Sequence, residues 1–171
     1  LIEASPSTAG ALRQLVKQSK TDSFQMELHN LAINKVRGSV RFVDAGIGRE
    51  KNQIIQGQHA KSVEVPAMNL DDLCAKLGVT KVDILKIDTE GYDAEVLYSG
   101  KQCLKKVSHL EFECHGIGAW KLHSLSKLIS YLELVGLECS FVGRDGVMYR
   151  LTQCWDDKFE HKSWSNVVCS R

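Results

Sequence analysis

The chain lacks several features that would mark special classes of protein. It has only two prolines in 171 residues and 7% aromatic residues, while 43% of its residues are hydrophobic and 25% are charged. This balance excludes a disordered or fibrous protein. No window of 18 residues is free of charge, so no membrane-spanning helix is predicted. Neither sign of charge predominates, because the chain has 22 basic and 21 acidic residues. We therefore expect no binding to nucleic acid or to a membrane.

Paired cysteine motifs are missing as well. None of the six cysteines stands in a C-x-x-C pair, so the usual zinc and thioredoxin-like spacings are absent. The cysteines that lie in apolar or periodic segments are Cys74, Cys103, Cys114 and Cys139. A free thiol in such a segment behaves as a small hydrophobic side chain, and we therefore expect reduced cysteines and a cytoplasmic location. The alternative is a Cys154–Cys169 bridge, if a signal upstream of this chain sends the protein elsewhere.

What the chain does have is an alternation of strand and helix patterns. Apolar residues at helical spacing alternate with short apolar runs, and the pattern ends in two runs separated by a polar turn. Helices are expected at 6–19, 69–78, 92–98 and 124–136, and strands at 24–31, 39–43, 63–66, 82–88, 107–114, 137–142 and 147–151, with a loop at 44–62 and a tail at 152–171. This order predicts a single α/β domain with a mostly parallel sheet and a C-terminal antiparallel hairpin.

Ligands of such sheets bind at the carboxyl ends of the strands. The polar residues expected at those ends are Glu3, His29, Asn30, Asp88, Glu90, Glu113 and His115. A carboxylate in the position of Glu3 is able to accept both hydroxyls of a ribose, although an acid near a helix N-terminus is also favourable without any ligand.

The sharpest of these signals is the sequence Asp-Thr-Glu-Gly at 88–91, directly after an apolar run. Lys86, Asp88 and Glu90 share one side of the predicted strand, and Gly91 permits a sharp turn into the next helix. Three ionisable groups at the end of a buried strand need each other or a ligand. The alternative to a functional site is an internal ion pair of Lys86 with Asp88 or Glu90.

A second pair of candidates follows the next strand. His115 titrates near neutral pH and is therefore able to take a proton from a hydroxyl group, with Glu113 to orient it. The alternative is a solvated histidine after a strand. The types of side chain at Asp88, Glu113 and His115 would also suit a metal ion, but their spacing does not require a metal, and we predict none.

These residues carry a resemblance to a known family. Residues 82–91 (VDILKIDTEG), followed by EVL at 95–97 and Gly100, resemble the central signature of the FkbM-type methyltransferases. Residues 69–73 (NLDDL), 2–6 (IEASP) and 29–33 (HNLAI) resemble three further family elements, with Asn69 where threonine is usual. The resemblance covers residues 1–151. The family's opening strand and its glycine-rich turn, "D-x-G-A-x-x-G", have no counterpart in this chain.

The resemblance implies a Rossmann-like methyltransferase sheet and O-methylation by S-adenosylmethionine of a hydroxyl on a small molecule or sugar. It implies that Glu3, Asn30, Asp88 and Glu90 bind the cofactor, and that His115, Glu113 or Lys86 handles the acceptor proton. In the family's sheet the opening strand is central, so we expect this domain to be N-terminally incomplete. The alternatives are a non-catalytic interaction domain and a nicotinamide-dependent oxidoreductase, whose ribose carboxylate occupies the place of Glu3.

Overall fold

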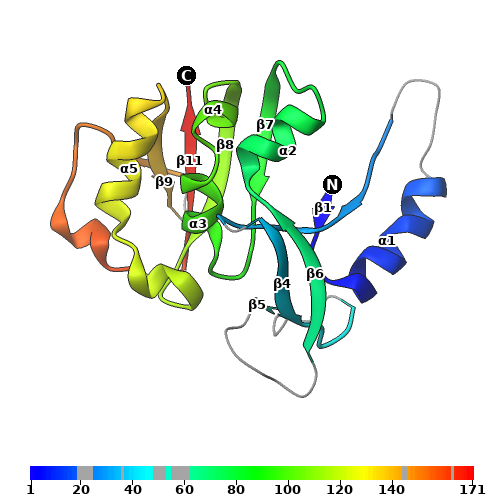
Figure 1. Cartoon of the computed structure of the whole chain (residues 1–171). Helices are drawn as coiled ribbons and strands as arrows, with labels where there is room; N and C mark the ends of the chain where they lie inside the picture. Colours follow the sequence, from blue (N-terminus) through cyan, green and yellow to red (C-terminus); the bar gives the residue numbers. More distant parts are fainter. Residues whose placement is uncertain (19–24, 36, 48–52, 55–61, 144–145, 163) are drawn as a thin grey trace. The chain divides into compact units, whose positions relative to one another are not determined.

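The computed structural model shows two compact units, residues 1–69 (unit 1) and residues 70–171 (unit 2). It describes residues 1–18, 25–35, 37–47, 53–54, 62–143, 146–162 and 164–171. Both units combine helices with strands, so the chain is a mixed α/β protein (Figure 1). Each unit is described by itself below.

In the residues that the structure describes, unit 1 consists of one helix and two small sheets. Its elements are β1 (Ile2–Glu3), α1 (Pro6–Gln18), β2 (His29–Asn30), β3 (Ala32–Ile33), β4 (Gly38–Val43), β5 (Gln53–Ile54) and β6 (Ser62–Met68). Strands β1 and β2 pair in parallel, and the other strands form a sheet in the order β3-β6-β4-β5. The strand predicted at 24–31 is therefore wrong in its extent, because pairing begins only at His29 in the described residues. Most of the predicted loop at 44–62 lies outside them, but β5 shows that it contains a short strand.

Local sequence explains the start of α1 and the core of unit 1. The Ser5 hydroxyl accepts a hydrogen bond from the Thr8 backbone N–H at 3.1 Å, and Pro6 occupies the first helical position. This confirms the predicted N-cap. The buried core cluster is small, and it consists of Ala32, Phe42, Val65 and Ala67.

Unit 2 is built around one five-stranded sheet. Its helices are α2 (Leu70–Lys76), α3 (Asp93–Tyr98), α4 (Lys101–Leu104) and α5 (Leu125–Leu134), with short 3-10 turns η1 (Gly118–Leu122) and η2 (Asp157–Glu160). Its strands are β7 (Val82–Ile87), β8 (Val107–Cys114), β9 (Glu138–Val142), β10 (Met148–Arg150) and β11 (Ser165–Ser170). The strand order is β10-β9-β11-β8-β7.

The helices of unit 2 gather on one face of this sheet. In Figure 1, α3, α4 and α5 lie in front of the strands, and α3 contacts β8 while α5 contacts β9. Along β8, Leu110, Phe112 and Cys114 are buried against this layer, whereas His109 on the opposite face is exposed. Because the side chains of a strand alternate between faces, this pattern places the hydrophobic core of unit 2 under the helices.

Strand β7 is at the edge of the described sheet, where it pairs in parallel with β8. Its apolar sequence predicted a buried strand, and that prediction is wrong for one of the two faces of the strand. Ile84 is 74% exposed, and Lys86 shares its face of the sheet, while Ile87 on the other face is buried. The apolar run therefore identified the strand correctly but not its environment.

The C-terminal part of the chain corrects the expected sheet. The predicted hairpin is confirmed, since β9 and β10 pair in an antiparallel fashion. The expected tail, however, contains β11, which inserts between β8 and β9 and runs antiparallel to both. In the described residues parallel pairing is limited to β1 with β2, β3 with β6, and β7 with β8, so the prediction of a mostly parallel sheet is wrong.

The cysteines also correct the sequence analysis. Cys74 of α2 is bonded to Cys103 of α4, and Cys139 of β9 is bonded to Cys169, which lies directly opposite in β11. The expectation of free thiols is therefore wrong at the bonded positions, and so is the alternative of a Cys154–Cys169 bridge. Cys114 is free and buried, as predicted, and Cys154 is free and exposed.

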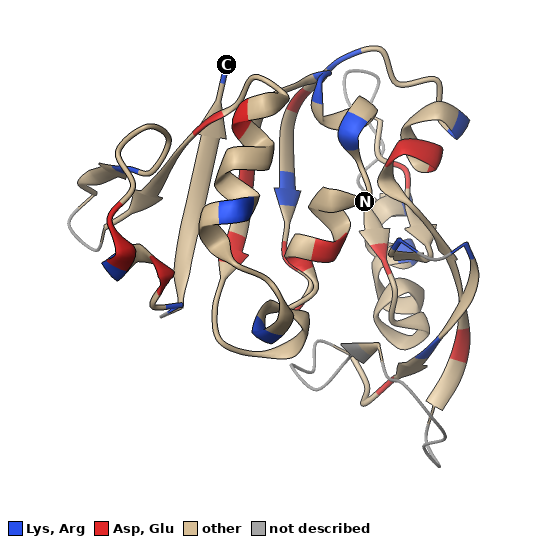
Figure 2. Ribbon diagram, turned by 60° about the vertical axis from the view of Figure 1, so that its left-hand side comes forward, with Lys and Arg blue, Asp and Glu red and all other residues tan. Residues whose placement is uncertain are grey.

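The distribution of charged residues and the lengths of the helices are relevant to binding of nucleic acid and of membranes. Lys and Arg are interspersed with Asp and Glu along the elements rather than gathered by sign (Figure 2). Across the described ranges, none of the helices combines the length and the apolar character that crossing a bilayer requires.

Candidate active site

Two of the predicted cofactor residues meet in unit 1. Parallel pairing of β1 with β2 sets Glu3 opposite Asn30. The Asn30 side-chain N–H₂ donates to the backbone carbonyls of Glu3 at 2.8 Å and Ala4 at 3.1 Å. Glu3 Oε1 accepts the backbone N–H of Ser5 at 2.7 Å. Asn30 thus holds the end of β1 in place, and no hydrogen bond from a described residue occupies Glu3 Oε2, which is the oxygen suited to a ligand hydroxyl.

Asp44 completes this corner of unit 1, and sequence reasoning missed it. Its carboxylate accepts hydrogen bonds from the Ser5 hydroxyl at 2.9 Å, the Ser7 hydroxyl at 2.6 Å and the Ser7 backbone N–H at 2.9 Å. Burial acts to raise the pKa of Asp44, but these bonds and one from Gly46 outweigh it and lower the pKa below its usual value. No local signal in the sequence indicated this contact, because Asp44 is 37 positions away from Ser7.

In unit 2 the turns that follow β7 and β8 are in close backbone contact at the carboxyl ends of both strands. Gly91 has φ +101° and Gly118 has φ +57°. A Cβ atom on Gly91 would stand 2.9 Å from the Ile117 carbonyl oxygen and 3.0 Å from Gly118 Cα. The Trp120 backbone N–H donates to the Gly91 carbonyl at 3.2 Å. Gly91 is therefore required by close backbone approach as well as by the turn that the sequence predicted.

Lys86 is paired, but with a different residue than expected. Its ammonium group donates to Glu111 Oε1 at 3.0 Å on the neighbouring strand, whereas Asp88 acts on it only through its charge. The hydrogen bond to Glu111 raises the pKa of Lys86. The amine thus stays protonated near neutral pH, which disfavours the predicted role of Lys86 as a base and suits an electrostatic role.

His115 is the most unusual of the predicted residues. It is 1% exposed, so the alternative of a solvated histidine is wrong. Neither ring nitrogen has a hydrogen-bond partner among the described residues, and Nε2 lies 3.9 Å from Glu113 Oε2. Burial lowers the pKa of His115, although the charges of Glu113 and Asp88 oppose the shift. The imidazole is therefore neutral near pH 7 and has a lone pair available for a proton.

Trp164, which sequence reasoning also missed, joins this pair. Its indole stacks on the His115 ring with centroids 4.6 Å apart and planes 19° apart. Its Nε1–H donates to Glu113 Oε2 at 3.2 Å. Trp164 is 51 positions from Glu113, so only the insertion of β11 beside β8 brings them together.

Asp93 lies next to the turn that follows β7, and it also contacts the backbone of Glu113 in β8. It is fully buried as the first residue of α3, and its carboxylate oxygens make no hydrogen bond of good geometry with any described residue. Burial raises the pKa of Asp93 to about 6, while contacts with Thr89 and the Glu113 backbone oppose the shift. A buried carboxyl group with a perturbed pKa beside an open strand end often marks a functional site. Sequence reasoning missed Asp93, because an acid at the start of a helix is common.

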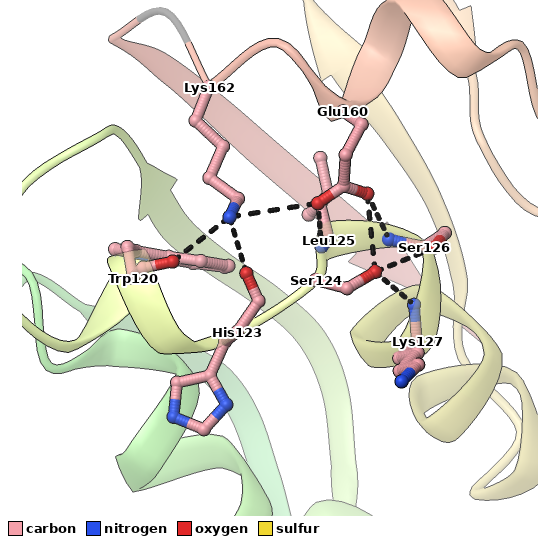
Figure 3. A network of polar contacts seen from close by, with 8 residues as sticks. All are labelled: Trp120, His123, Ser124, Leu125, Ser126, Lys127, Glu160 and Lys162. Carbon is pink, nitrogen blue, oxygen red and sulfur yellow. Dashed lines mark hydrogen bonds and ion pairs between the residues drawn. The ribbon is translucent and has the colours of Figure 1, made fainter.

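A polar network supports the turn that follows His115 (Figure 3). Lys162 donates to the backbone carbonyls of Trp120, at 2.9 Å, and His123, and it pairs with Glu160 at 3.6 Å. Glu160 accepts the backbone N–H groups of Leu125 at 2.9 Å and Ser126 at 3.1 Å at the start of α5. The segment before β11 is thereby fastened to η1 and α5, which fixes the chain on either side of the His115 site.

The described part of the chain holds no group of three His, Cys, Asp or Glu side chains arranged to bind a metal ion. What it holds is an α/β framework with polar residues at the carboxyl ends of strands. In unit 1 these are Glu3 and Asn30, and in unit 2 they are Asp88, Glu113 and His115. This is the arrangement of an α/β enzyme domain, whose ligands bind at strand ends.

The comparison with known families identifies this domain further. Residues 1–141 match the family described as the methyltransferase FkbM domain, so the chain belongs to the FkbM methyltransferase family. This confirms the resemblance seen in the sequence and makes the chain a methyltransferase. No curated protein and no solved structure gives a significant match.

Proposed function

We propose that the chain transfers a methyl group from S-adenosylmethionine to a hydroxyl group of a small molecule or sugar. The observation that carries the proposal is the family match across residues 1–141, which includes all the predicted site residues. Two features of the structure support the proposal. In unit 1 the carboxylate of Glu3 is suited to bind a ribose, and in unit 2 Glu113 and His115 are suited to accept a proton.

The residues of unit 1 fit the cofactor's ribose. Glu3 Oε1 is held by the Ser5 backbone N–H, which orients the carboxylate, and Oε2 remains to accept a ribose hydroxyl. We assign Asn30 the place beside the adenine, although its amide N–H₂ already supports the end of β1. Asp88 and Glu90 are assigned to the amino-acid end of the cofactor or to the acceptor, because they follow β7 at its carboxyl end.

The residues of unit 2 handle the proton. When bound, S-adenosylmethionine supplies an electrophilic methyl group, so the protein's task is to position the acceptor and remove its hydroxyl proton. Glu113 and His115 are both suited to receive that proton, since Glu113 is a partly exposed carboxylate and the buried His115 is neutral. Lys86, kept cationic by Glu111, contributes positive charge beside Asp88.

Titration calorimetry of the protein with S-adenosylhomocysteine and with NAD tests the cofactor class. We expect saturable binding of S-adenosylhomocysteine and no binding of NAD. Binding of NAD alone would support the oxidoreductase, for which Glu3 would serve equally as the ribose carboxylate. A protein that binds neither compound would be a non-catalytic domain, and the proposal would be wrong.

A further inference from the structure

The indole of Trp164 lies in a site beside His115 and Glu113 that suits an aromatic ring with a hydrogen-bond donor. One face lies against His115, and the indole Nε1–H points to Glu113 Oε2. Trp164 itself is 63% exposed, whereas the His115 ring that it covers is buried. Both nitrogens of that ring lack a partner in the described residues, so the site under the indole is polar and unsatisfied.

A groove of about 710 Å³ opens at the same place. Four aromatic residues line it, Phe141, Tyr149, Phe159 and Trp164, together with the polar side chains of Glu113 and Asn166. Glu113 is the one charged residue in the described lining. Aromatic faces favour a ring, and a carboxylate favours a hydroxyl donor while repelling an anion.

We infer that Trp164 stands in for the methyl acceptor, and that the acceptor is a neutral ring compound whose hydroxyl donates to Glu113. The inference rests on the proposed function and adds the substrate class. On binding, the acceptor ring displaces the indole from His115 and takes over both of its contacts. A phenol and a sugar both have this chemistry, since each offers a ring face and a neutral hydroxyl.

The groups present complete the reaction. The acceptor hydroxyl gives its proton to Glu113 Oε2, and its oxygen forms a bond to the methyl carbon. The carbon–sulfur bond of S-adenosylmethionine breaks, its electron pair stays on sulfur, and the products are a methyl ether and S-adenosylhomocysteine. Glu113 is thus the first acceptor of the proton, and His115, 3.9 Å away, takes the proton on from it, so both residues are needed for turnover.

Nuclear magnetic resonance of the indole N–H signals tests the displacement. The chain has three tryptophans, and Trp164→Phe assigns the signal of Trp164. The probes are 4-methylphenol, methyl β-D-glucopyranoside, anisole as a ring without a hydroxyl, and 4-methylbenzoate as an anionic ring. We expect a saturable shift of the Trp164 signal with at least one of the first two probes, and the responding probe distinguishes a phenolic from a sugar acceptor. An unmoved signal with both, or an equal shift with anisole or 4-methylbenzoate, would overturn the inference.

A variant decides whether Trp164 is an occupant or part of the binding surface. If it must leave, Trp164→Ala removes the displacement step and lowers the Kd of the responding probe about three- to tenfold, measured by ligand-observed resonance. Trp155→Phe, at a tryptophan outside the groove lining, should leave the Kd unchanged. Weaker binding by Trp164→Ala would contradict the inference. Calorimetry with S-adenosylhomocysteine on the same samples separates the two proposals, because intact cofactor binding with an unmoved Trp164 signal rejects only the acceptor site.

The disulfides independently support a second inference. Cys74–Cys103 joins two helices and Cys139–Cys169 joins two neighbouring strands, and all four residues are buried. Such structural disulfides persist in oxidising compartments and are rare in the cytosol. We infer that this chain matures in an oxidising compartment, which replaces the cytoplasmic location expected from its sequence.

Alkylation of protein from its native source tests this location. Denaturation with a maleimide, without any reductant, should add two labels, at Cys114 and Cys154, because these are the free cysteines. Digestion without reduction should yield the two linked peptide pairs. Six labels would contradict the inference.

Discussion

The two units differ in how firmly they hold their functional residues. In unit 1, Glu3 and Asn30 lie on strands of two residues each, and the buried core cluster consists of Ala32, Phe42, Val65 and Ala67. In unit 2, Glu113 and His115 follow an eight-residue strand packed on fully buried side chains such as Trp120 and Phe112. Catalytic geometry needs rigid support, whereas cofactor binding supplies part of its own ordering. We therefore expect changes in unit 2 to affect turnover and stability, and changes in unit 1 to affect cofactor affinity.

The largest effect is expected at His115. His115→Ala removes a neutral proton acceptor and the surface under Trp164, and should lower turnover about 10²- to 10⁴-fold. Because burial lowers the pKa of His115, the parent's rate should rise with pH through a value below 6.5, and the variant should lose that dependence. A methyl-transfer assay across pH, with His109→Ala as the control on the exposed face of β8, measures both. Parental turnover and an unchanged profile would leave the role to Glu113 alone.

The glycine contact after β7 should control the stability of unit 2. Gly91→Ala places a Cβ atom 2.9 Å from the Ile117 carbonyl in a backbone conformation that alanine rarely adopts, and should cost about 2–4 kcal/mol of unfolding free energy. Gly78→Ala is the matched control, because Gly78 has φ +62° but no atom within 4 Å of an added Cβ. Chemical denaturation measures both variants. Equal losses would show that the close approach of the two turns contributes nothing.

Asp93 should oppose the stability of unit 2 at neutral pH. Its folded pKa of about 6 exceeds the ordinary value of 3.8, so the folded state binds the proton more tightly than the unfolded state. Stability from this group is therefore complete below pH 3.8 and is lost as pH rises through 6. Asp93→Asn should stabilise the protein by up to about 3 kcal/mol at pH 7 and by little at pH 4. Thermal unfolding at both pH values measures this, and the exposed Asp83→Asn serves as control; a gain independent of pH would contradict it.

The smallest effect is expected at the helix cap in Figure 3. Hydrogen bonds from Leu125, Ser126 and Ser124 and the charge of Lys162 lower the pKa of Glu160, although partial burial opposes them. Glu160→Gln should cost about 1 kcal/mol at pH 7, and the difference should shrink as pH falls from 4.5 through the lowered pKa of the folded state, because the unfolded and then the folded carboxylate become protonated. Glu138→Gln, at an exposed acid of β9, should cost less. A larger loss of stability in Glu138→Gln than in Glu160→Gln would show that Glu160 does not stabilise the start of α5.

The sequence predicted much of the local structure, and it predicted the family. Periodicity placed β8 at its observed bounds, and the Asp-Thr-Glu-Gly signal at 88–91 identified the family, because both depend on neighbouring residues. Long-range contacts were not predictable in this way. The insertion of β11, the cysteine pairing and the stacking of Trp164 on His115 all join distant segments, and cysteine connectivity in particular does not follow from spacing.

Calorimetric titration of S-adenosylhomocysteine into Glu3→Ala and Glu113→Gln tests the division of roles between the units most directly. Glu3→Ala loses charge-assisted hydrogen bonds to ribose and should raise the Kd about tenfold to a hundredfold. Glu113→Gln keeps the shape of the side chain but loses its charge as a proton acceptor, so its Kd should equal that of the parent while methyl transfer falls. An unchanged Kd in Glu3→Ala, or an equal rise in both variants, would contradict the account.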